Sequence, residues 1–217
     1  MTLEYDLFWS FRSPYSYLVT SRLVAMERDY DVKCNVRVVY PIAVRQPEFF
    51  DNSDPLWFTY LAKDTYRTAA FLGLPFHWPR PDPVVMDFAT RKYPKEQPYI
   101  YRLTRLGQVA TEMGKGLAFL DAVSQLIWDG NTIGWHEGDH LANAAARAGL
   151  DLAAMDVIAA RDAERLDAII DASQVAQREA GHYGVPMMAV DGEPFFGQDR
   201  FDQLEWRLKL KGMQKRG

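Results

Sequence analysis

Segments with strand character occur only near the two ends of this 217-residue chain, and this distribution limits the folds that it can adopt. Near the start, residues 3–10 alternate and are rich in aromatics, and residues 32–41 are dense in β-branched side chains. Near the end, residues 184–192 and 193–196 are short extended runs joined by an Asp-Gly hairpin signal. Because a helix separates the first two strands, they are expected to be parallel with a right-handed crossover. The order is β-α-β, a helical block, then β-β-α, which predicts an α/β protein with a four-stranded sheet assembled from both ends.

The block between these ends has helical spacing, with many Ala, Leu and Arg residues and few β-branched runs. The expected helices are Trp57–Leu72, Tyr99–Glu112, Leu117–Trp128, His140–Ala148 and Ala153–Glu179, the last of them bent or split. Six prolines between residues 75 and 98 exclude a long helix there. We therefore expect one discontinuous domain, residues 1–53 and 173–217, with a helical insertion of residues 54–172. The cleft between the two is where we expect a ligand.

Composition and charge exclude several classes of protein. Hydrophobic residues make up 48% and charged residues 25% of the chain, which is typical of a globular protein that buries a sizeable core. With 29 acidic and 25 basic residues, the formal charge of -4 gives no overall basic field that would attract nucleic acid. Glu4 and Asp6 stand where a secretory signal has basic and then apolar residues, and no run is long and apolar enough to span a membrane. We therefore expect a cytoplasmic, soluble protein.

Two patterns that suggest thiol or metal chemistry are assigned structural roles. Cys34 is the only cysteine, so no internal disulfide or dithiol redox pair can form, and we expect it to be a buried small hydrophobic residue. His136 to His140 formally fits H-E-x-x-H, the zinc protease signature. That chemistry needs both histidines on one face of an established helix, whereas Gly138 and Asp139 indicate a loop ending in a helix N-cap. We therefore expect no metal site.

Ser13 and Pro14 stand where the first strand gives way to the first helix. Serine is a leading N-cap residue, and proline at the first helical position loses no hydrogen bond. The positive end of the helix dipole also favours an anion there. Ser13 can therefore be a structural cap, a binding group, or both.

Four segments together resemble a known family. They are SFRSPYSYL (10–18), YLAKDTYRTAAFLGLPF (60–76), GVP (184–186) and FFGQDRFDQLE (195–205). In this order they are similar to the 2-hydroxychromene-2-carboxylate isomerases and the related kappa-class glutathione transferases, which share the DsbA-like thioredoxin fold. The redox C-x-x-C of DsbA proteins occupies the place of Ser13 to Ser16 here. The resemblance implies a thioredoxin-like domain with an all-α insertion, and glutathione as the cofactor.

The resemblance also implies roles for individual residues. Ser13 matches the catalytic serine, whose hydroxyl donates a hydrogen bond to the glutathione sulfur. Pro186 matches a cis-proline facing that serine, and Val185 matches the residue whose backbone binds the cysteinyl unit. Gln198 and Asp199, at the start of the last helix, match positions that hold the γ-glutamyl end. The implied glutathione-binding set is Ser13, Pro14, Tyr15, Val185, Pro186, Gln198 and Asp199.

Some of these residues also have simple structural interpretations. Pro186 can be an ordinary turn proline, since only ~5–6% of X-Pro bonds in folded proteins are cis. Asp199 can be the N-cap of the last helix. The substrate side is assigned to Arg12, Trp57 and Tyr60, and Trp57 stands where these families usually have a lysine.

The implied function is glutathione-dependent isomerisation of an aromatic-derived keto acid. A thiol with a pKa near ~8.5 is mostly protonated at neutral pH, so a helix N-terminus and a hydroxyl donor would raise its thiolate fraction. The thiolate would add reversibly to a conjugated C=C, allow rotation, and be eliminated. Alternatives are a kappa-like glutathione transferase and a protein that binds glutathione or another ligand without turnover. A dithiol oxidoreductase is disfavoured by the single cysteine, and a homodimer is expected by family analogy.

Overall fold

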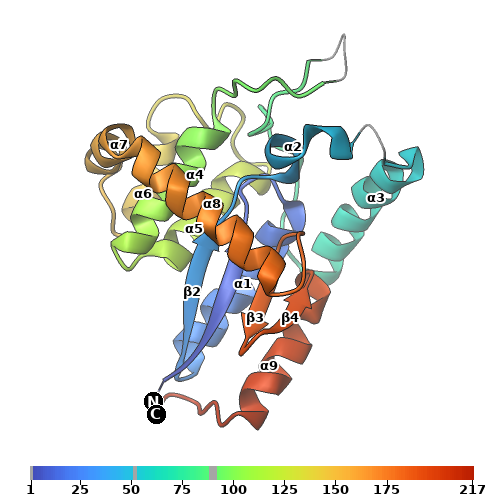
Figure 1. Cartoon of the computed structure of the whole chain (residues 1–217), viewed down its shortest axis with the longest axis vertical. Helices are drawn as coiled ribbons and strands as arrows, with labels where there is room; N and C mark the ends of the chain where they lie inside the picture. Colours follow the sequence, from blue (N-terminus) through green and yellow to red (C-terminus); the bar gives the residue numbers. More distant parts are fainter. Residues whose placement is uncertain (1, 51–52, 88–91) are drawn as a thin grey trace.

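The two ends of the chain form one mixed four-stranded sheet. The computed structural model describes residues 2–50, 53–87 and 92–217. The elements in chain order are β1 (Leu3–Trp9), α1 (Pro14–Asp29), β2 (Val32–Val38), α2 (Ile42–Arg45), α3 (Pro55–Leu72), α4 (Ile100–Glu112), α5 (Gly116–Trp128), α6 (His140–Arg147), α7 (Leu152–Arg161), α8 (Ala163–Glu179), β3 (Met187–Val190), β4 (Glu193–Phe196) and α9 (Phe201–Leu210), with 3₁₀ turns η1 (Pro47–Phe49) and η2 (Gln198–Arg200). The strand order is β2-β1-β3-β4 (Figure 1).

Strand directions match the expected topology. β1 pairs in parallel with β2, from Leu3 opposite Val32 to Trp9 opposite Val38. β3 is antiparallel to β1, and β4 is antiparallel to β3. The predicted α/β sheet from both chain ends, with a parallel β1–β2 pair, is therefore confirmed in its order and pairing, and the right-handed crossover stays a prediction.

Helix termini follow local capping chemistry. Ser13 caps α1, because its side-chain oxygen accepts a hydrogen bond from the Ser16 backbone N–H at 3.2 Å, and Pro14 takes the first helical position. Asp54 caps α3 in the same way through the Leu56 N–H at 2.8 Å. The long helix expected over residues 153–179 is split at Asp162 into α7 and α8, as the sequence indicated.

Helices cover both faces of the sheet. On one face, Phe8, Val39, Met187 and Ala189 pack against Ala176 of α8 and against Ala180, its C-cap. The helix α8 crosses the front of the sheet in Figure 1. On the other face, α1 and α5 pack together. The helices α4 to α7 gather on one side in Figure 1, whereas α3 lies apart from them and contacts α1. The expected domain boundary after residue 172 falls inside α8, and the proposed division into two domains stays a prediction.

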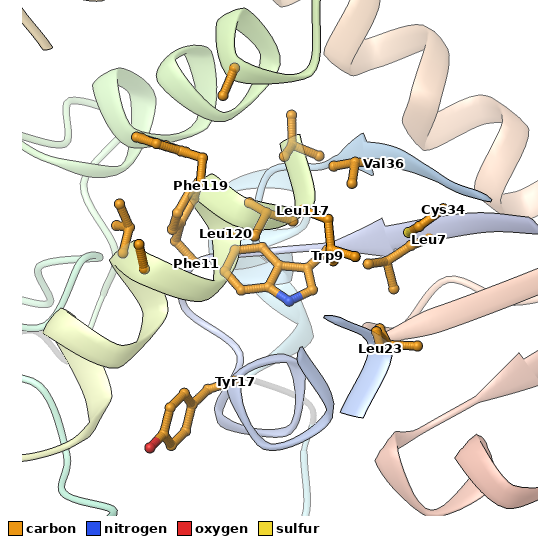
Figure 2. Close-up of a cluster of buried hydrophobic side chains, with 14 of the residues drawn as sticks. Leu7, Trp9, Phe11, Tyr17, Leu23, Cys34, Val36, Leu117, Phe119 and Leu120 are labelled. Atoms are coloured by element: carbon orange, nitrogen blue, oxygen red, sulfur yellow. The ribbon is translucent and has the colours of Figure 1, made fainter. Parts of the chain in front are cut away.

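One hydrophobic core runs from the sheet into the helical segment. Trp9 and Phe11, fully buried, meet edge to face with ring centroids 4.7 Å apart, and Phe11 meets Phe119 of α5 at 6.3 Å. Figure 2 shows these rings together with Leu117 and Leu120 of α5. The indole N–H of Trp9 donates to the Thr20 hydroxyl at 3.0 Å, so the buried polar atom is satisfied.

The two chain ends meet at the edge of the fold away from the β1–α1 turn (Figure 1). Asp31 donates its backbone N–H to Gln214 at 2.8 Å, and Arg216 donates its own to Asp29 at 2.9 Å. The Thr2 hydroxyl donates to Asp31 at 3.2 Å. The tail after α9 is therefore held against the turn between α1 and β2.

The observed bounds differ from expectation mainly near prolines. β2 ends at Val38 rather than at Pro41, and the short helix α2 follows where no helix was expected. β3 begins at Met187, after Pro186, because proline has no N–H to give to a sheet. The last helix begins with η2 rather than as regular α-helix at Asp199. Among the described residues, no helix is both long and apolar enough to cross a bilayer.

Candidate functional site

Ser13 faces the loop before β3, as the sequence comparison implied. Its hydroxyl donates to the Val185 carbonyl, with the two oxygens 3.2 Å apart, although the residues are 172 positions apart in sequence. The same oxygen accepts the Ser16 N–H, so Ser13 acts as a cap and also faces the loop. The Val185–Pro186 peptide bond is cis, and the turn-proline interpretation with a trans bond is wrong. The structure thus places the first turn of α1 opposite a cis-proline loop.

The cis-proline loop is also tied to the turn after β4. The Gly197 N–H donates to the Pro186 carbonyl at 2.9 Å. Gly197 has φ 99°, a left-handed backbone conformation that favours glycine. This contact brings η2 beside the loop. Gln198 and Asp199, the residues expected to bind the γ-glutamyl end of glutathione, lie on η2.

Gln198 is oriented by Arg22 of α1. One Arg22 nitrogen, Nη2, donates to the Gln198 carbonyl at 2.8 Å and to its side-chain oxygen at 2.7 Å. Burial lowers the pKa of Arg22, and the charges of Asp202 and Asp199 offset part of this effect. The Arg22 Nε atom is buried and has no hydrogen-bond partner within the part of the chain that the structure describes. A positive group with an unused donor therefore lies beside the start of η2.

Asp199 does not cap the last helix. The N-cap of η2 is Gly197, and Asp199 instead pairs with the neighbouring Arg200 at 2.9 Å, with its side chain 61% exposed. The structural interpretation of Asp199 as an N-cap is therefore wrong. Its carboxylate is accessible at the end of β4.

Arg12 is engaged by an acidic partner rather than free. Its Nε donates to Asp82 at 3.1 Å and its Nη2 to Asp82 and to the Tyr93 hydroxyl, both at 3.3 Å. Burial lowers the pKa of Arg12, but the charges and hydrogen bonds of Asp82 and Tyr93 together outweigh burial, and the net pKa is raised. The guanidinium also lies 5.2 Å from the Tyr93 ring centroid and 5.9 Å from that of Phe50.

Trp57 belongs to a group of aromatic rings that we call the aromatic band: Phe49, Phe50, Trp57, Phe58, Tyr93 and Tyr183. Trp57 meets Phe50 with ring centroids 6.0 Å apart and Phe49 at 6.2 Å. Phe49 in turn lies 6.2 Å from Tyr183, two residues before Val185. The band therefore connects the start of α3 to the cis-proline loop. Trp57 is 41% exposed, so part of this aromatic surface faces solvent.

Tyr15 and Tyr60 meet in a second polar cluster between α1 and α3. The Tyr15 hydroxyl donates to Asp64 at 2.5 Å, and Arg67 donates to the other oxygen of the same carboxylate. Arg67 also reaches the Tyr60 hydroxyl at 3.4 Å. Burial raises the pKa of Asp64, and hydrogen bonds from Tyr15 and Arg67 outweigh it, so that the net pKa is lowered. This cluster fixes α3 against the turn that carries Ser13.

Replacing Tyr15 with phenylalanine is expected to lower the free energy of unfolding by about 1 kcal/mol, because Asp64 loses one charge-assisted hydrogen bond in a partly exposed place. Urea unfolding at neutral pH measures this. Tyr66→Phe on α3, where the Tyr66 side chain is 45% exposed, serves as the control and should change stability by less than about 0.5 kcal/mol. Equal effects of the two substitutions would remove the cluster from the account of how α3 is held.

Cys34 and the H-E-x-x-H string lie outside this arrangement. Cys34 is buried in β2, and burial raises the pKa of its thiol, as expected for an inert residue. His136 lies in a loop against Tyr99, with its Nε2 3.4 Å from the Tyr99 hydroxyl, whereas His140 begins α6. The two histidines do not share the face of one helix.

Two hollows on the surface lie away from Ser13. One of about 410 Å³ lies at the other end of β1 and is lined by Glu4, Asp6, Glu179 and Asp191 among others. Three of these carboxylates already pair with Lys33, Arg37 and Lys211. A smaller one, near His77 and Arg80, belongs to the loops of the helical segment. The candidate site therefore rests on the chemistry around Ser13 rather than on either hollow.

The sequence analysis did not identify several residues of this region. Arg22 and Asp64 lie one to three turns from expected site positions, and only the packing of α1 against η2 and α3 gives them partners. His182, in the loop before Val185, was missed as well. A signal was present in Arg22, a basic side chain between buried residues of α1.

Comparisons with known proteins agree with this geometry. The model of the DSBA-like thioredoxin domain matches residues 5–209, and among curated proteins no sequence matches this chain. Of the solved structures, a 2-hydroxychromene-2-carboxylate isomerase has 22% identity and a TM-score of 0.67, covering 96% of this chain and 95% of its own. A probable DsbA oxidoreductase from Streptomyces coelicolor has 17% identity and a TM-score of 0.64, covering 94% and 89%.

The cytosolic disulfide reductase DsbM from Pseudomonas aeruginosa is also similar, at 19% identity and a TM-score of 0.59, covering 96% and 100%. Another structure of DsbM, with GSH, has 16% identity and a TM-score of 0.58, covering 96% and 98%. At these identities the likeness shows a common fold. Since the family model spans nearly the whole chain, this protein belongs to the DSBA-like thioredoxin domain family.

Proposed function

We propose that this protein is a glutathione-dependent isomerase of the 2-hydroxychromene-2-carboxylate isomerase type. The observation that carries the proposal is the Ser13 hydroxyl at the start of α1, 3.2 Å from the Val185 carbonyl beside cis-Pro186. A serine at this place supplies a hydrogen-bond donor but no sulfur. The only cysteine, Cys34, is buried, so a reactive thiol at Ser13 would come from a bound molecule.

The residues present fit a glutathione molecule. Arg22 has a buried, unpartnered Nε beside η2, among the residues that the structure describes, and it suits the carboxylate of the γ-glutamyl end. Val185 lies against Ser13 and would hold the cysteinyl unit through its backbone. Gln198 and Asp199 would complete the γ-glutamyl end, and Pro14 and Tyr15 the loop around the sulfur. The solved structure of DsbM with GSH supports a glutathione site in this fold.

The chemistry of the chain's own residues would be electrostatic. Bound glutathione would supply a thiol whose thiolate adds reversibly to a conjugated C=C. Ser13 would turn its hydroxyl from the Val185 carbonyl toward the sulfur and stabilise the negative charge, and the dipole of α1 acts in the same direction. No side chain that carries a strong base is needed at this position, because the pKa of the thiol is lowered by its surroundings.

The aromatic band supports an aromatic substrate. Trp57 offers a partly exposed ring surface, and Arg12 lies beneath Phe50 with its charge balanced by Asp82. Tyr60, 61% exposed, and Arg67 provide polar groups on the neighbouring face of α3. We assign the substrate side to Arg12, Trp57 and Tyr60, with Arg12 shaping the surface through Phe50 and Tyr93.

Glutathione at about 100 times its Kd is expected to raise the free energy of unfolding by about 2.7 kcal/mol. A thermal-shift titration measures this, and the matched control is the same tripeptide with alanine in place of cysteine, which should stabilise less because it lacks the sulfur. No shift with either peptide would contradict the glutathione site. Equal shifts would show binding without a role for the thiol contact.

Activity assays then separate the isomerase from its alternatives. Isomerisation of a conjugated aromatic keto acid with no net consumption of glutathione supports the proposal. Consumption of glutathione in an adduct favours a kappa-like transferase instead. Binding with neither activity favours a protein that binds glutathione without turnover. This alternative is motivated by Trp57, which stands where the resembling families usually have a lysine. The homodimer and the cytoplasmic location stay predictions, which light scattering and fractionation test.

A further inference from the structure

His182 holds the backbone that leads into the cis-proline loop. Its Nδ1 atom accepts a hydrogen bond from the Gly184 N–H at 2.8 Å. A ring nitrogen can accept only while it is unprotonated, so this contact requires a neutral ring with its proton on Nε2. The residue after Gly184 is Val185, whose carbonyl accepts the Ser13 hydroxyl. The side chain of His182, a titratable group, therefore binds the residue directly before Val185.

The ring itself has little freedom to move. It stacks on Phe196 of β4 with ring centroids 3.8 Å apart and on Tyr183 at 4.8 Å. A Cβ on Gly184 would lie 2.4 Å from the Phe196 ring and 3.0 Å from His182, so the loop passes as close to both rings as glycine allows. Burial lowers the pKa of His182 from 6.5. The neutral form is thus the one that this packing favours.

The other polar groups of the loop are held by side chains that do not titrate near neutrality. The Gln177 side-chain amide donates to the Gly184 carbonyl at 2.7 Å. Arg45 donates to the Tyr183 carbonyl at 3.0 Å and to the Gln177 side-chain oxygen at 3.3 Å. The Gly184 N–H, by contrast, is held by the one group that changes charge between about pH 5 and 8.

Charged side chains lie on the elements packed around the loop. On α2 and α8, Arg45 and Arg178 lie near each other, and burial followed by the Arg178 charge lowers the pKa of Arg45 to about 10. Carboxylates on the packed elements include Glu48 of η1, Glu179 of α8, Glu193 of β4 and Asp199 of η2. Glu193 pairs with Arg207, and Asp199 pairs with Arg200.

We propose that His182 is a positioning residue that makes the Ser13–Val185 arrangement dependent on pH. Protonation of Nδ1 would place one N–H against another, so that Gly184 loses its acceptor and moves away. The Val185 carbonyl, on the next residue, would then lose its alignment with Ser13. The expected consequence is weaker binding of the thiol ligand in acid, and only this consequence rests on the proposed function.

The test compares His182→Asn with His182→Phe. Asparagine can accept the N–H two residues on through its side-chain oxygen, and this group does not titrate. Phenylalanine keeps a ring for stacking but has no acceptor. In the wild type, the hydrogen-exchange protection of the Gly184 amide, followed by NMR, should fall about tenfold between pH 7.5 and 5. The Asn variant should keep its protection across this range, and the Phe variant should have low protection throughout.

Stability provides a second readout without ligand. A folded-state pKa below the unfolded value of 6.5 means that the contribution of His182 is fully present above pH 6.5 and is lost as the pH falls below it. Urea unfolding of the wild type should show this slope, and the Asn variant should lack it. Between pH 7.5 and 5, the affinity for glutathione, measured by calorimetry, should fall about tenfold more in the wild type than in the Asn variant. The titration of the glutathione thiol is the same in both experiments, so the difference between them reports on His182.

The outcomes separate this inference from the proposed function. Equal Gly184 protection at pH 7.5 and 5 in the wild type would overturn the inference, as would the same pH dependence in the Asn variant. If neither protein binds glutathione but the Gly184 step is present only in the wild type, the positioning role stands and the proposed function fails.

Discussion

If the proposed isomerase reaction is correct, replacing Ser13 with alanine is expected to lower its turnover by about 100-fold. This is the usual effect of removing one preorganised hydrogen-bond donor from a negatively charged group in the active site. The Ser13 hydroxyl is positioned on both sides, by the Ser16 N–H and the Val185 carbonyl, each at 3.2 Å. Alanine removes the donor and leaves the helix dipole in place, so part of the activity should remain. Steady-state kinetics with glutathione and a conjugated aromatic keto acid measure the change.

The matched control is Ser16→Ala in the same turn of α1. The Ser16 hydroxyl is buried and has no hydrogen-bond partner within the described residues, so its loss should leave turnover within about twofold and stability nearly unchanged. The Ser13 variant should lower kcat more than it raises KM, since the contact matters most to the charged sulfur. Unchanged turnover in Ser13→Ala would remove this residue from the mechanism and leave it as an N-cap.

Replacing Phe119 with alanine is expected to lower the free energy of unfolding by about 3–5 kcal/mol, because a fully buried ring leaves a cavity that the surrounding core fills only in part. Phe119 of α5 meets Phe11, directly after β1, with ring centroids 6.3 Å apart. The contact that the substitution removes is one that joins the helical segment to the sheet. Urea unfolding followed by both tryptophan fluorescence and far-ultraviolet circular dichroism measures it.

Phe71→Ala on α3 is the control, since this ring is 86% exposed and its removal should cost less than about 0.5 kcal/mol. If the shared core couples the two parts of the chain, both probes should follow one transition that shifts as a whole in the Phe119 variant. Separate transitions, with only one of them shifted, would contradict a single cooperative core.

Much of the fold could be predicted because its signals are local. The β-branched runs, the Asp-Gly hairpin and the capping residue Ser13 each act within a few positions, and the observed β1, α1, β2 and β3–β4 hairpin follow from them. The helix over residues 153–179 was expected to be bent or split, and the structure places the break at Asp162. The end of β2 was misplaced, because the β-branched run continues past Val38 although the strand pairing does not.

The site was predicted in part, through resemblance rather than through local signals. Ser13, Val185 and cis-Pro186 meet as expected, but the implied catalytic and binding roles stay predictions. Arg12 was expected to be available to a substrate and is instead paired with Asp82, 70 positions along the chain. Such pairings depend on the path of the proline-rich loop, which no local pattern specifies. His182 was not identified either, because its position in the site depends on its hydrogen bond with Gly184 and on stacking against Phe196 of β4.

The meeting of the two chain ends has a practical consequence for experiments on this protein. Hydrogen bonds fix the C-terminal tail near Asp29 and Asp31, close to the N-terminus and beyond the beginning of β1, whereas Ser13 follows its other end. A fluorophore, affinity tag or surface tether added at either terminus would therefore extend from the side opposite Ser13. Labelled protein should accept small molecules as readily as unlabelled protein, and joining the termini through a short linker should permit new termini to be opened elsewhere.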